Sequence, residues 1–525
     1  MADLAQSNKR IRPVKSSTRW VRLRKIAQAM SLLAFLSVLI LTKREGLPAV
    51  LANIPIRLDP LGMLAQALAT RLVLTGSLLA LSVILLTIVF GRVWCGWLCP
   101  LGTTLDLFPF KSRHKGKAAR REGYESLRTI KYILLLAILL AALFGNLTLL
   151  VFDPITIYIR TFGTSIWPVL GHAVTAFESL LYQVHWLAGP ITRFDAWLRP
   201  AILPYEAAFY REALLYAGIF ALVIGLNWMA PRFWCRYICP LGGLLGFLSK
   251  FAIFQRRIGE ACRSCVLCTQ SCPTGTIDPA KAYASDPAEC TMCMDCQQAC
   301  PRGAIRFSPA LPAPLWAPYD PNRGKALAVF GSTLLALALF KSDGRNRDKN
   351  FYLIRPPGSN EKDLLSQCIR CGECVRTCPT NGLQPAITES GIEGLWTPIV
   401  IPRLGYCDYS CNACGQICPV EAIPSLNLEE KRMQVIGKAY IDQNRCIAWS
   451  DHLDCIVCEE MCPLPDKAIR LENGQFTDEE GESRTILLPH VLRDLCIGCG
   501  ICEYKCPVSG EAAIRVHIPN AEVLF

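Results

Sequence analysis

Charged side chains are scarce in this 525-residue chain, where Asp, Glu, Lys and Arg together make up only 19%. Hydrophobic residues make up 52%, a balance too apolar for an ordinary soluble protein, which predicts membrane spans. The chain also lacks a Cys-x-x-Cys-His motif for covalent haem, a Gly-x-Gly-x-x-Gly dinucleotide site and a P-loop. We therefore expect no haem, flavin or nicotinamide site, and we identify no catalytic residue.

Four apolar runs in the first 250 residues are each long enough to cross a membrane. Each holds roughly 17–21 residues without a charge, and a bilayer core of about 30 Å needs about 20. A buried helix of a large globular domain is the alternative for any one run, but four in one half of the chain favour a membrane domain. The predicted spans cover about residues 26–42, 72–90, 132–152 and 213–230.

Basic residues are distributed unevenly around these spans, and this predicts the orientation. Eight precede the first span and eight lie at residues 111–131, between the second and third, whereas residues 151–211 carry four basic and four acidic residues. Because cytoplasmic segments are enriched in Lys and Arg, we expect residues 1–25 and the 110–131 loop to be cytoplasmic and 151–211 to face outward. Thr164–Gly189 is apolar but interrupted by proline, histidine and glutamate, and we expect an outer interfacial helix there.

A ten-residue motif occurs twice in the membrane half, with the copies 140 residues apart. Each copy carries Cys-x-x-x-Cys-Pro at the end of a span, with Cys95 and Cys99 in the first and Cys235 and Cys239 in the second. Cysteines four apart share a helix face, so each copy presents two sulfurs side by side. We expect the four to meet near the cytoplasmic face and to hold a shared cluster, with a dithiol pair or simple packing as the alternatives.

These paired motifs, with their flanking aromatic residues and Leu-Gly, resemble the membrane polyferredoxins of the NapH type from periplasmic nitrate reductase systems. They are also similar to membrane proteins of nitrous-oxide reductase and of cytochrome oxidase assembly. The resemblance covers about residues 20–310 and implies a multi-pass protein of a prokaryotic inner membrane. His172 and His185 could line a quinone pocket or ligate a haem there, although such histidines are more often interfacial.

Two adjacent cysteine runs after the membrane half have the Cys-x2-Cys-x2-Cys-x3-Cys-Pro spacing of bacterial ferredoxins. In such runs three thiolates bind one [4Fe–4S] cluster and the fourth binds the other. Zinc sites use Cys-x2-Cys pairs separated by longer gaps, so zinc does not fit. The predicted ligand sets are Cys262, Cys265, Cys268 and Cys300 for one cluster, and Cys290, Cys293, Cys296 and Cys272 for the other.

Four more runs follow, each ending in Cys-Pro; the second opens with a three-residue gap and the third has eight residues after its first cysteine. The stretch from Cys418 to Cys446 resembles the interior of a two-cluster ferredoxin. We therefore expect nested pairing, second run with third and first with fourth. The predicted sets are Cys368, Cys371, Cys374 and Cys506; Cys496, Cys499, Cys502 and Cys378; Cys407, Cys411, Cys414 and Cys462; and Cys446, Cys455, Cys458 and Cys418.

Residues 360–525 resemble the NapG-type four-cluster ferredoxins and, more distantly, the iron–sulfur subunits of molybdopterin oxidoreductases. The segment Arg355-Pro356-Pro357-Gly358 ahead of the first late run carries this resemblance. NapG-type ferredoxins are exported behind a basic, apolar leader, and residues 326–340 form an apolar run of 15 residues. We therefore favour a fifth span at 326–340 and an extracytoplasmic domain at 360–525, with a cytoplasmic linker helix as the alternative.

Together these patterns predict a membrane α-helical bundle joined to α+β ferredoxin-like domains. We expect six [4Fe–4S] clusters and a seventh at the membrane cysteines. These clusters would pass electrons between a membrane quinol and a redox protein or oxidoreductase subunit. We expect the protein to contact lipid but not nucleic acid. The alternative is a metal-handling assembly factor that uses the membrane cysteine pairs. The predicted divisions are a cytoplasmic N-terminus at 1–25, a transmembrane domain at 26–250, a cytoplasmic two-cluster domain at 251–310, a linker at 311–359 and a four-cluster domain at 360–525.

Overall fold

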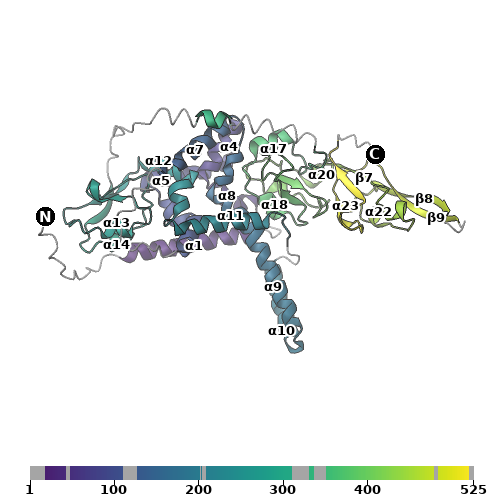
Figure 1. Cartoon of the computed structure of the whole chain (residues 1–525), viewed down its shortest axis with the longest axis horizontal. Helices are drawn as coiled ribbons and strands as arrows, with labels where there is room; N and C mark the ends of the chain where they lie inside the picture. The colour runs from purple at the N-terminus through teal and green to yellow at the C-terminus, as the bar shows by residue number, and fades with distance from the viewer. Residues whose placement is uncertain are drawn as a thin grey trace.

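The computed structural model places a helical bundle between two small units of mixed helix and strand (Figure 1). We call these the first unit (residues 251–309) and the late unit (residues 350–519). All ten strands found among the described residues lie in the two units. The structure describes residues 18–42, 48–109, 127–201, 203, 208–309, 330–335, 350–477 and 483–519.

Four long helices run between the two ends of the bundle: α1 (Thr18–Leu41), α5 (Leu78–Phe90), α7 (Arg128–Leu143) and α11 (Ala213–Gly225). Their sequences are rich in Leu and Ala, which form helices readily and leave few polar groups to satisfy. They coincide with the four predicted spans. Short helices fill the spaces beside them: α2 (Ala49–Ala52), α3 (Ile54–Arg57), α4 (Pro60–Thr70), α6 (Pro100–Leu107), α8 (Pro154–Thr161) and α12 (Pro240–Ser249).

The predicted lengths of three spans are wrong. Among the described residues, only the helix Arg19–Leu41 is both long and apolar enough to cross a membrane unaided. The predicted span at 132–152 breaks where α7 ends at Leu143, because Gly145 adopts φ +75° and a 3₁₀ turn follows at Thr148–Phe152. α5 and α11 have 13 residues each, about 20 Å of helix. Helix length therefore does not show a multi-span membrane domain.

Two of the short helices begin with the same Asp-Pro signature, which the sequence analysis missed. Asp59 accepts hydrogen bonds from the backbone N–H groups of Leu61 and Gly62 at the start of α4. Asp153 does the same at the start of α8, at 2.9 Å. An acidic N-cap followed by proline is a strong helix start. The bundle is therefore built from two similar halves, each with an Asp-Pro helix and a Cys-Pro helix.

The predicted interfacial segment forms the first part of a helical hairpin that projects from the bundle (Figure 1). Its helices are α9 (Trp167–Tyr182) and α10 (Ala188–Ala201). Arg199 pairs with Glu178 and Asp195 and so fastens one helix to the other. Trp186 and Trp197 are largely exposed. The fifth predicted span at 326–340 is described only at residues 330–335, which are helical, and the rest lies outside the described residues.

The first unit is a small module of two strand pairs and two helices. Strand β1 (Phe254–Ile258) pairs antiparallel with β4 (Ile305–Pro309), and these strands enclose both cysteine runs. Helices α13 (Leu267–Ser271) and α14 (Asp295–Ala299) each carry the third cysteine of a run. A second short pair joins β2 (Ile277–Asp278) to β3 (Ala284–Ser285). The unit has its own small core, which includes Ile277, Tyr283 and Ile305.

The late unit contains two such modules in sequence. Its strand pairs are β5 (Leu383–Pro385) with β6 (Pro398–Val400), β7 (Lys438–Ile441) with β10 (Ile514–His517), and β8 (Ile469–Thr477) with β9 (Ser483–Val491). Its helices are α17 (Glu361–Gln367), α18 (Glu373–Thr377), α19 (Ala413–Gln416), α20 (Leu428–Arg432), α21 (Ile447–Ser450), α22 (Val457–Glu460) and α23 (Ile501–Lys505). Its apolar core is continuous with that of the bundle.

Contacts at the two ends of α1 place the units at opposite ends of the bundle (Figure 1). Arg24 donates to the carbonyl oxygen of Cys293 in the first unit at 2.8 Å. At the other end of α1, Arg376 of the late unit donates to the carbonyl oxygen of Leu39. Residues 24 and 39 are about 22 Å apart along a helix. The bundle therefore separates the two units.

Candidate iron–sulfur centres

Four of the ferredoxin runs share a left-handed backbone turn, which brings the cysteines of the run close together. The residue after the second cysteine has a left-handed conformation: Val266 (φ 63°), Met294 (φ 64°), Gly372 (φ 80°) and Gly500 (φ 83°). For valine and methionine this conformation is strained, and such strain gathers at functional sites. The two runs with irregular spacing lack it, since Asn412 and Ile456 have negative φ.

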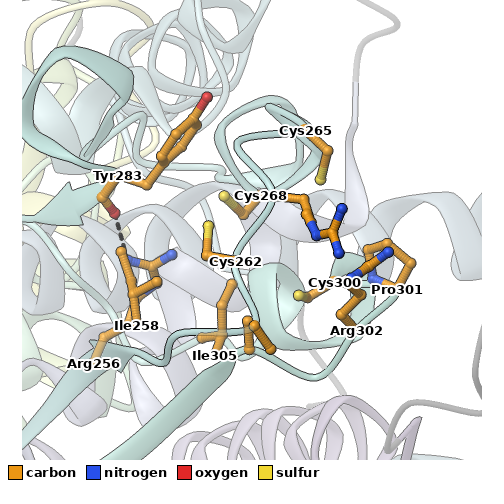
Figure 2. Close-up of a pocket in the computed structure, with 13 residues that line it drawn as sticks. Arg256, Ile258, Cys262, Cys265, Cys268, Tyr283, Cys300, Pro301, Arg302 and Ile305 are labelled. Carbon is orange, nitrogen blue, oxygen red and sulfur yellow. Dashed lines mark hydrogen bonds between the residues drawn. The ribbon is translucent and has the colours of Figure 1, made fainter. Parts of the chain in front are cut away.

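The first unit brings together the two predicted cysteine sets. Cys262, Cys265, Cys268 and Cys300 line one cavity (Figure 2). Cys272 lies within electrostatic range of Cys290, Cys293 and Cys296, and so belongs to the second set. The structure therefore places the last cysteine of each run beside the other run, and cluster ligation by these two sets stays a prediction.

The nested pairing predicted for the late unit is wrong. Cys418 lies beside Cys368, Cys371 and Cys374, and Cys378 lies beside the second run. The third and fourth runs likewise exchange their last cysteines. The observed sets are Cys368, Cys371, Cys374 and Cys418; Cys407, Cys411, Cys414 and Cys378; Cys446, Cys455, Cys458 and Cys506; and Cys496, Cys499, Cys502 and Cys462.

Strand pairing explains this sequential order. β7 ends just before the third run, and its partner β10 follows the fourth run. β1 and β4 enclose the first unit in the same way. The stretch from Cys418 to Cys446 that suggested a ferredoxin interior is instead a connector. Its helix α20 is fixed by a capping box between Asn427 and Glu430, and it leads into β7.

The sets form a row within the late unit. The backbone N–H of Cys407 donates to the carbonyl oxygen of Cys499 at 2.8 Å, so the second and fourth runs touch. Cys502 lies within electrostatic range of Cys458. The row therefore starts at the Cys368 set against the bundle and ends at the Cys446 set, farthest from it.

The four bundle cysteines meet, as predicted. Cys99 lies within electrostatic range of Cys95 and Cys235, and Cys239 lies within range of the other three. The local geometry differs from the predicted single helix face. Each pair spans a π-helical turn, in which the N–H of Cys99 or Cys239 donates to a carbonyl oxygen five residues earlier at 2.9 Å. The second cysteine then begins the next helix, ahead of its proline. We call these four residues the bundle quartet.

The surroundings of the bundle quartet fit a group that carries negative charge on sulfur. Burial raises the pKa of Cys235 to about 11 and those of Cys99 and Cys239 further, so free thiols would be neutral there. Two buried arginines nevertheless face the quartet. Arg232 donates to the carbonyl oxygen of Cys95 at 3.1 Å. The Nε and Nη2 atoms of Arg92 are buried near Cys95 and Cys239 without a hydrogen-bond partner, and cluster sulfurs would accept from them.

The spacing of the cysteine sets disfavours a single metal ion. Among the described residues, no three Cys, His, Asp or Glu side chains lie close enough together to hold one. A tetrahedral zinc site needs sulfurs about 2.3 Å from one ion, whereas four thiolates around a [4Fe–4S] cluster bind four separate irons. The chain's own residues therefore match a cluster better than zinc.

Helix α1 contacts the sites one after another along its length. Arg24 contacts the backbone of Cys293, which belongs to the second set of the first unit. Gln28 and Ser31 donate to the carbonyl oxygens of Gly96 and Leu98, in the first π-helical turn of the bundle quartet, at 3.0 and 2.8 Å. Leu39 contacts the late unit. The bundle quartet therefore lies between the two units along α1.

Close backbone packing joins the bundle quartet to the first unit. A Cβ atom on Gly96 would lie 2.2 Å from the carbonyl oxygen of Thr291, so only glycine fits this position. The indole N–H of Trp97 donates to the carbonyl oxygen of Met292 at 2.9 Å. Both partners lie in the run that starts at Cys290. Repeated motifs predicted a shared site here, but no sequence signal predicted this contact.

Helix α8 leads from the bundle quartet to the late unit. Tyr158 lies within electrostatic range of Cys99. Two residues later, Arg160 donates to the carbonyl oxygen of Arg370 at 2.9 Å and lies within range of Cys368 and Cys371. Residues of one helix, α8, therefore lie close to both the bundle quartet and the first late set.

A cavity of about 750 Å³ opens beside the bundle quartet. It is bordered by apolar residues of α1 and α6 and by the polar group of Gln28, Asp106 and Arg232. No sequence pattern indicated this cavity. His172 and His185 lie elsewhere, exposed at the projecting hairpin.

Three protein families match the chain. One is a 4Fe-4S binding domain that matches residues 72–117 and 213–259, the segments that contain the bundle quartet. Another 4Fe-4S binding domain matches residues 489–509. A 4Fe-4S dicluster domain matches residues 282–379, although its two cysteine runs lie at opposite ends of the bundle. We attribute that match to ferredoxin-like sequence in each run and not to one folded module.

Several curated proteins are similar to part of the chain. The methylamine utilization ferredoxin-type protein MauM of Methylorubrum extorquens is 36% identical over 203 residues, 37% of this chain and 85% of MauM. Ferredoxin-type protein NapG of Escherichia coli is 37% identical over 169 residues, 31% of this chain and 69% of NapG. NapF of the same organism is 30% identical over 167 residues, 31% of this chain and 86% of NapF. No solved structure matches the chain.

These comparisons confirm the resemblance to NapG-type ferredoxins and the presence of multiple 4Fe-4S binding domains. The NapH-type resemblance of the first 310 residues stays a prediction.

Proposed function

The chain belongs to the ferredoxin-type iron–sulfur electron-transfer proteins related to NapG and MauM, and on this premise we propose that it is an integral membrane protein that carries electrons between two faces of a membrane. The observation that carries this proposal is the position of the bundle quartet between two ferredoxin units. When bound, [4Fe–4S] clusters accept and release one electron at a time. The chain's part is to hold and space the seven cysteine sets.

We propose that all 28 cysteines are iron ligands in seven sets, six in the units and one in the bundle. Sulfurs that converge from distant parts of the sequence, beside buried arginines, support a ligand role. In the bundle quartet, the thiols of Cys99, Cys235 and Cys239 are buried and have raised pKa values, so they are poorly suited to exchange metal with a client. This favours an electron carrier over a metal-handling assembly factor.

The proposed orientation rests on charge. Arg19, Arg22 and Lys25 lie near the N-terminal end of α1, where the first unit is attached, and Arg128 begins α7 at that same end. Because basic residues mark the cytoplasmic side, we place the first unit in the cytoplasm and the late unit outside. α1 crosses unaided, whereas the shorter α5, α7 and α11 would cross as part of the bundle, in contact with lipid.

The cavity beside the bundle quartet is the proposed site for a quinol. Its volume is in the range of cofactor pockets, and its walls combine apolar residues such as Leu32 and Leu33 with a few polar groups. Arg232 links the cavity to the quartet, because it pairs with Asp106 on one side and donates to Cys95 on the other. At the outer end, a redox protein or oxidoreductase subunit would exchange electrons with the late unit.

Iron and sulfide analysis of the full chain, purified without oxygen, tests the proposal. Seven sets predict about 28 iron atoms per chain, and Cys95→Ser should lower this to about 24. Cys455→Ser is the matched control, because it should remove one set from the late unit and leave the bundle quartet intact. About 24 iron atoms in the unaltered chain, unchanged by Cys95→Ser, would contradict a cluster in the bundle.

A further inference from the structure

Two cysteines of the first unit differ in exposure from all the others. Among the 28 cysteines, only Cys262 and Cys265 are exposed, and both belong to the set that also contains Cys268 and Cys300. Figure 2 shows both among the residues that line the cavity. A group held there would approach the protein surface more closely than at any other set.

Arginines border this opening. Arg263 and Arg302 line the cavity and are exposed, and Arg256 lines its inner wall. Arg256 is held in place because it donates to the carbonyl oxygen of Tyr283 at 2.8 Å. None of the described residues that line the cavity is acidic. Positive charge around a concave opening attracts anionic partners and speeds their association.

We propose that this surface, which we call the arginine rim (Arg263 and Arg302), docks an acidic redox protein that exchanges single electrons with the first unit. The inference rests on the proposed function and names the chemistry of a partner at its cytoplasmic end. A protein is favoured over a small anion because the cavity itself is lined by four cysteines. What remains for recognition is the charged rim around them.

The partner gives up one electron, which is taken up at the site that Cys262 and Cys265 help to form. Acidic one-electron carriers such as flavodoxin have the required chemistry, since a flavin hydroquinone becomes a semiquinone when it loses one electron. Salt screens the attraction between surface charges that are farther apart than the Debye length, which is about 10 Å at 0.1 M, so added salt should slow the association.

Strand geometry supplies a matched control. Side chains alternate between the two faces of a strand. Arg256 and Ile258 of β1 line the cavity, as does Ile305 of β4, so Arg257 and Arg306 point to the opposite face. Arg257 and Arg306 are direct neighbours across the strand pair and are exposed. Reversing their charge changes the net charge of the unit equally without touching the rim.

The test uses the full chain in detergent and flavodoxin as the acidic probe. Stopped-flow absorbance would follow reduction by flavodoxin hydroquinone over a range of salt concentrations. Calorimetry would measure binding of oxidised flavodoxin, independently of electron transfer. We expect Arg263→Glu with Arg302→Glu to slow reduction at least tenfold at low salt, to weaken binding and to flatten the salt dependence. Arg257→Glu with Arg306→Glu should change the reduction rate, the binding affinity and the salt dependence each by less than threefold.

Two results would overturn the inference. One is equal slowing by the two double variants, and the other is a reduction rate that rises with salt in the unaltered chain. Reduction by dithionite, a small reagent, separates this failure from failure of the proposed function. If dithionite reduces both double variants as it does the unaltered chain, the clusters are intact and only the docking surface is in question. If it reduces none of them, the electron-transfer function itself fails.

Discussion

The two ferredoxin units share a cysteine pattern but differ in how they join the bundle and in what they present outward. The late unit shares one apolar core with the bundle, including Leu39, Ile155 and Val375. The first unit has a separate core and is attached mainly through polar contacts such as Arg24 with Asp295 and Lys131 with Glu289. The two units therefore share the fold that surrounds the cysteine sets but attach to the bundle through different kinds of contact.

The outermost sites of the two units also carry opposite charge. The first unit presents the arginine rim around exposed cysteines. At the Cys446 set of the late unit, the inserted residues include exposed Asp451, Asp454 and Leu453, and Glu460 lies exposed on α22. The irregular spacing of the third run thus provides an acidic surface. This difference suggests that the two ends receive partners of opposite charge.

The largest expected effect concerns attachment. Arg376 pairs with Glu373, and both side chains are almost completely buried. Arg376→Met should destabilise the late unit by about 3–5 kcal/mol, because it leaves an uncompensated buried carboxylate and removes the contact with Leu39. Arg24→Met should cost the first unit less, since its partner Asp295 is 26% exposed. Thermal unfolding of the full chain would measure the loss of stability in each variant. Equal losses in Arg376→Met and Arg24→Met would contradict the proposed difference in attachment between the two units.

A smaller effect is expected at the acidic end. Asp451→Lys with Glu460→Lys should slow electron exchange with cytochrome c, a basic probe, about tenfold at low salt, because attraction becomes repulsion. Glu429→Lys on α20 is the control, as it is exposed but lies away from the Cys446 set. Stopped-flow absorbance of the haem would give the rates. Equal rates in the reversed and control variants would show that charge at this end does not select the partner.

The smallest effect is a pH dependence at the bundle. Burial alone would raise the pKa of Asp106, but its hydrogen bonds and charge pairing with Arg232 outweigh burial and lower it. A carboxyl whose pKa is lower in the folded state stabilises the fold above its unfolded pKa and loses that contribution as the pH falls. We expect unfolding temperatures to fall less between about pH 5 and pH 2 in Asp106→Asn than in the unaltered chain. If unfolding temperature fell with pH equally in Asp106→Asn and in the unaltered chain, Asp106 would make no such contribution to stability.

Sequence patterns predicted the cysteine sets of the first unit and the meeting of the bundle quartet, because ligand spacing and repeated motifs leave few alternatives. Sequence patterns did not predict the cysteine sets of the late unit, because those sets depend on pairing between strands that are far apart in the sequence. The exchange between the third and fourth runs depends on β7 meeting β10, some 70 residues apart, which no local motif encodes. Helices lie at all four predicted spans, but three of them are shorter than expected, because an apolar run alone does not mark where a helix ends: α7 stops ahead of Gly145, which has φ +75°. The Asp-Pro helix starts, by contrast, are a local signal that sequence reasoning could have used.

The position of the two units relative to the membrane is the central claim, and protease access tests it most directly. The measurement uses intact spheroplasts of cells that make the full chain with a cleavable tag either before Met1 or after Phe525. The account predicts that added protease removes the tag after Phe525 at once and the tag before Met1 only after lysis. Protection of both tags until the membrane is broken would place both units in the cytoplasm and contradict it.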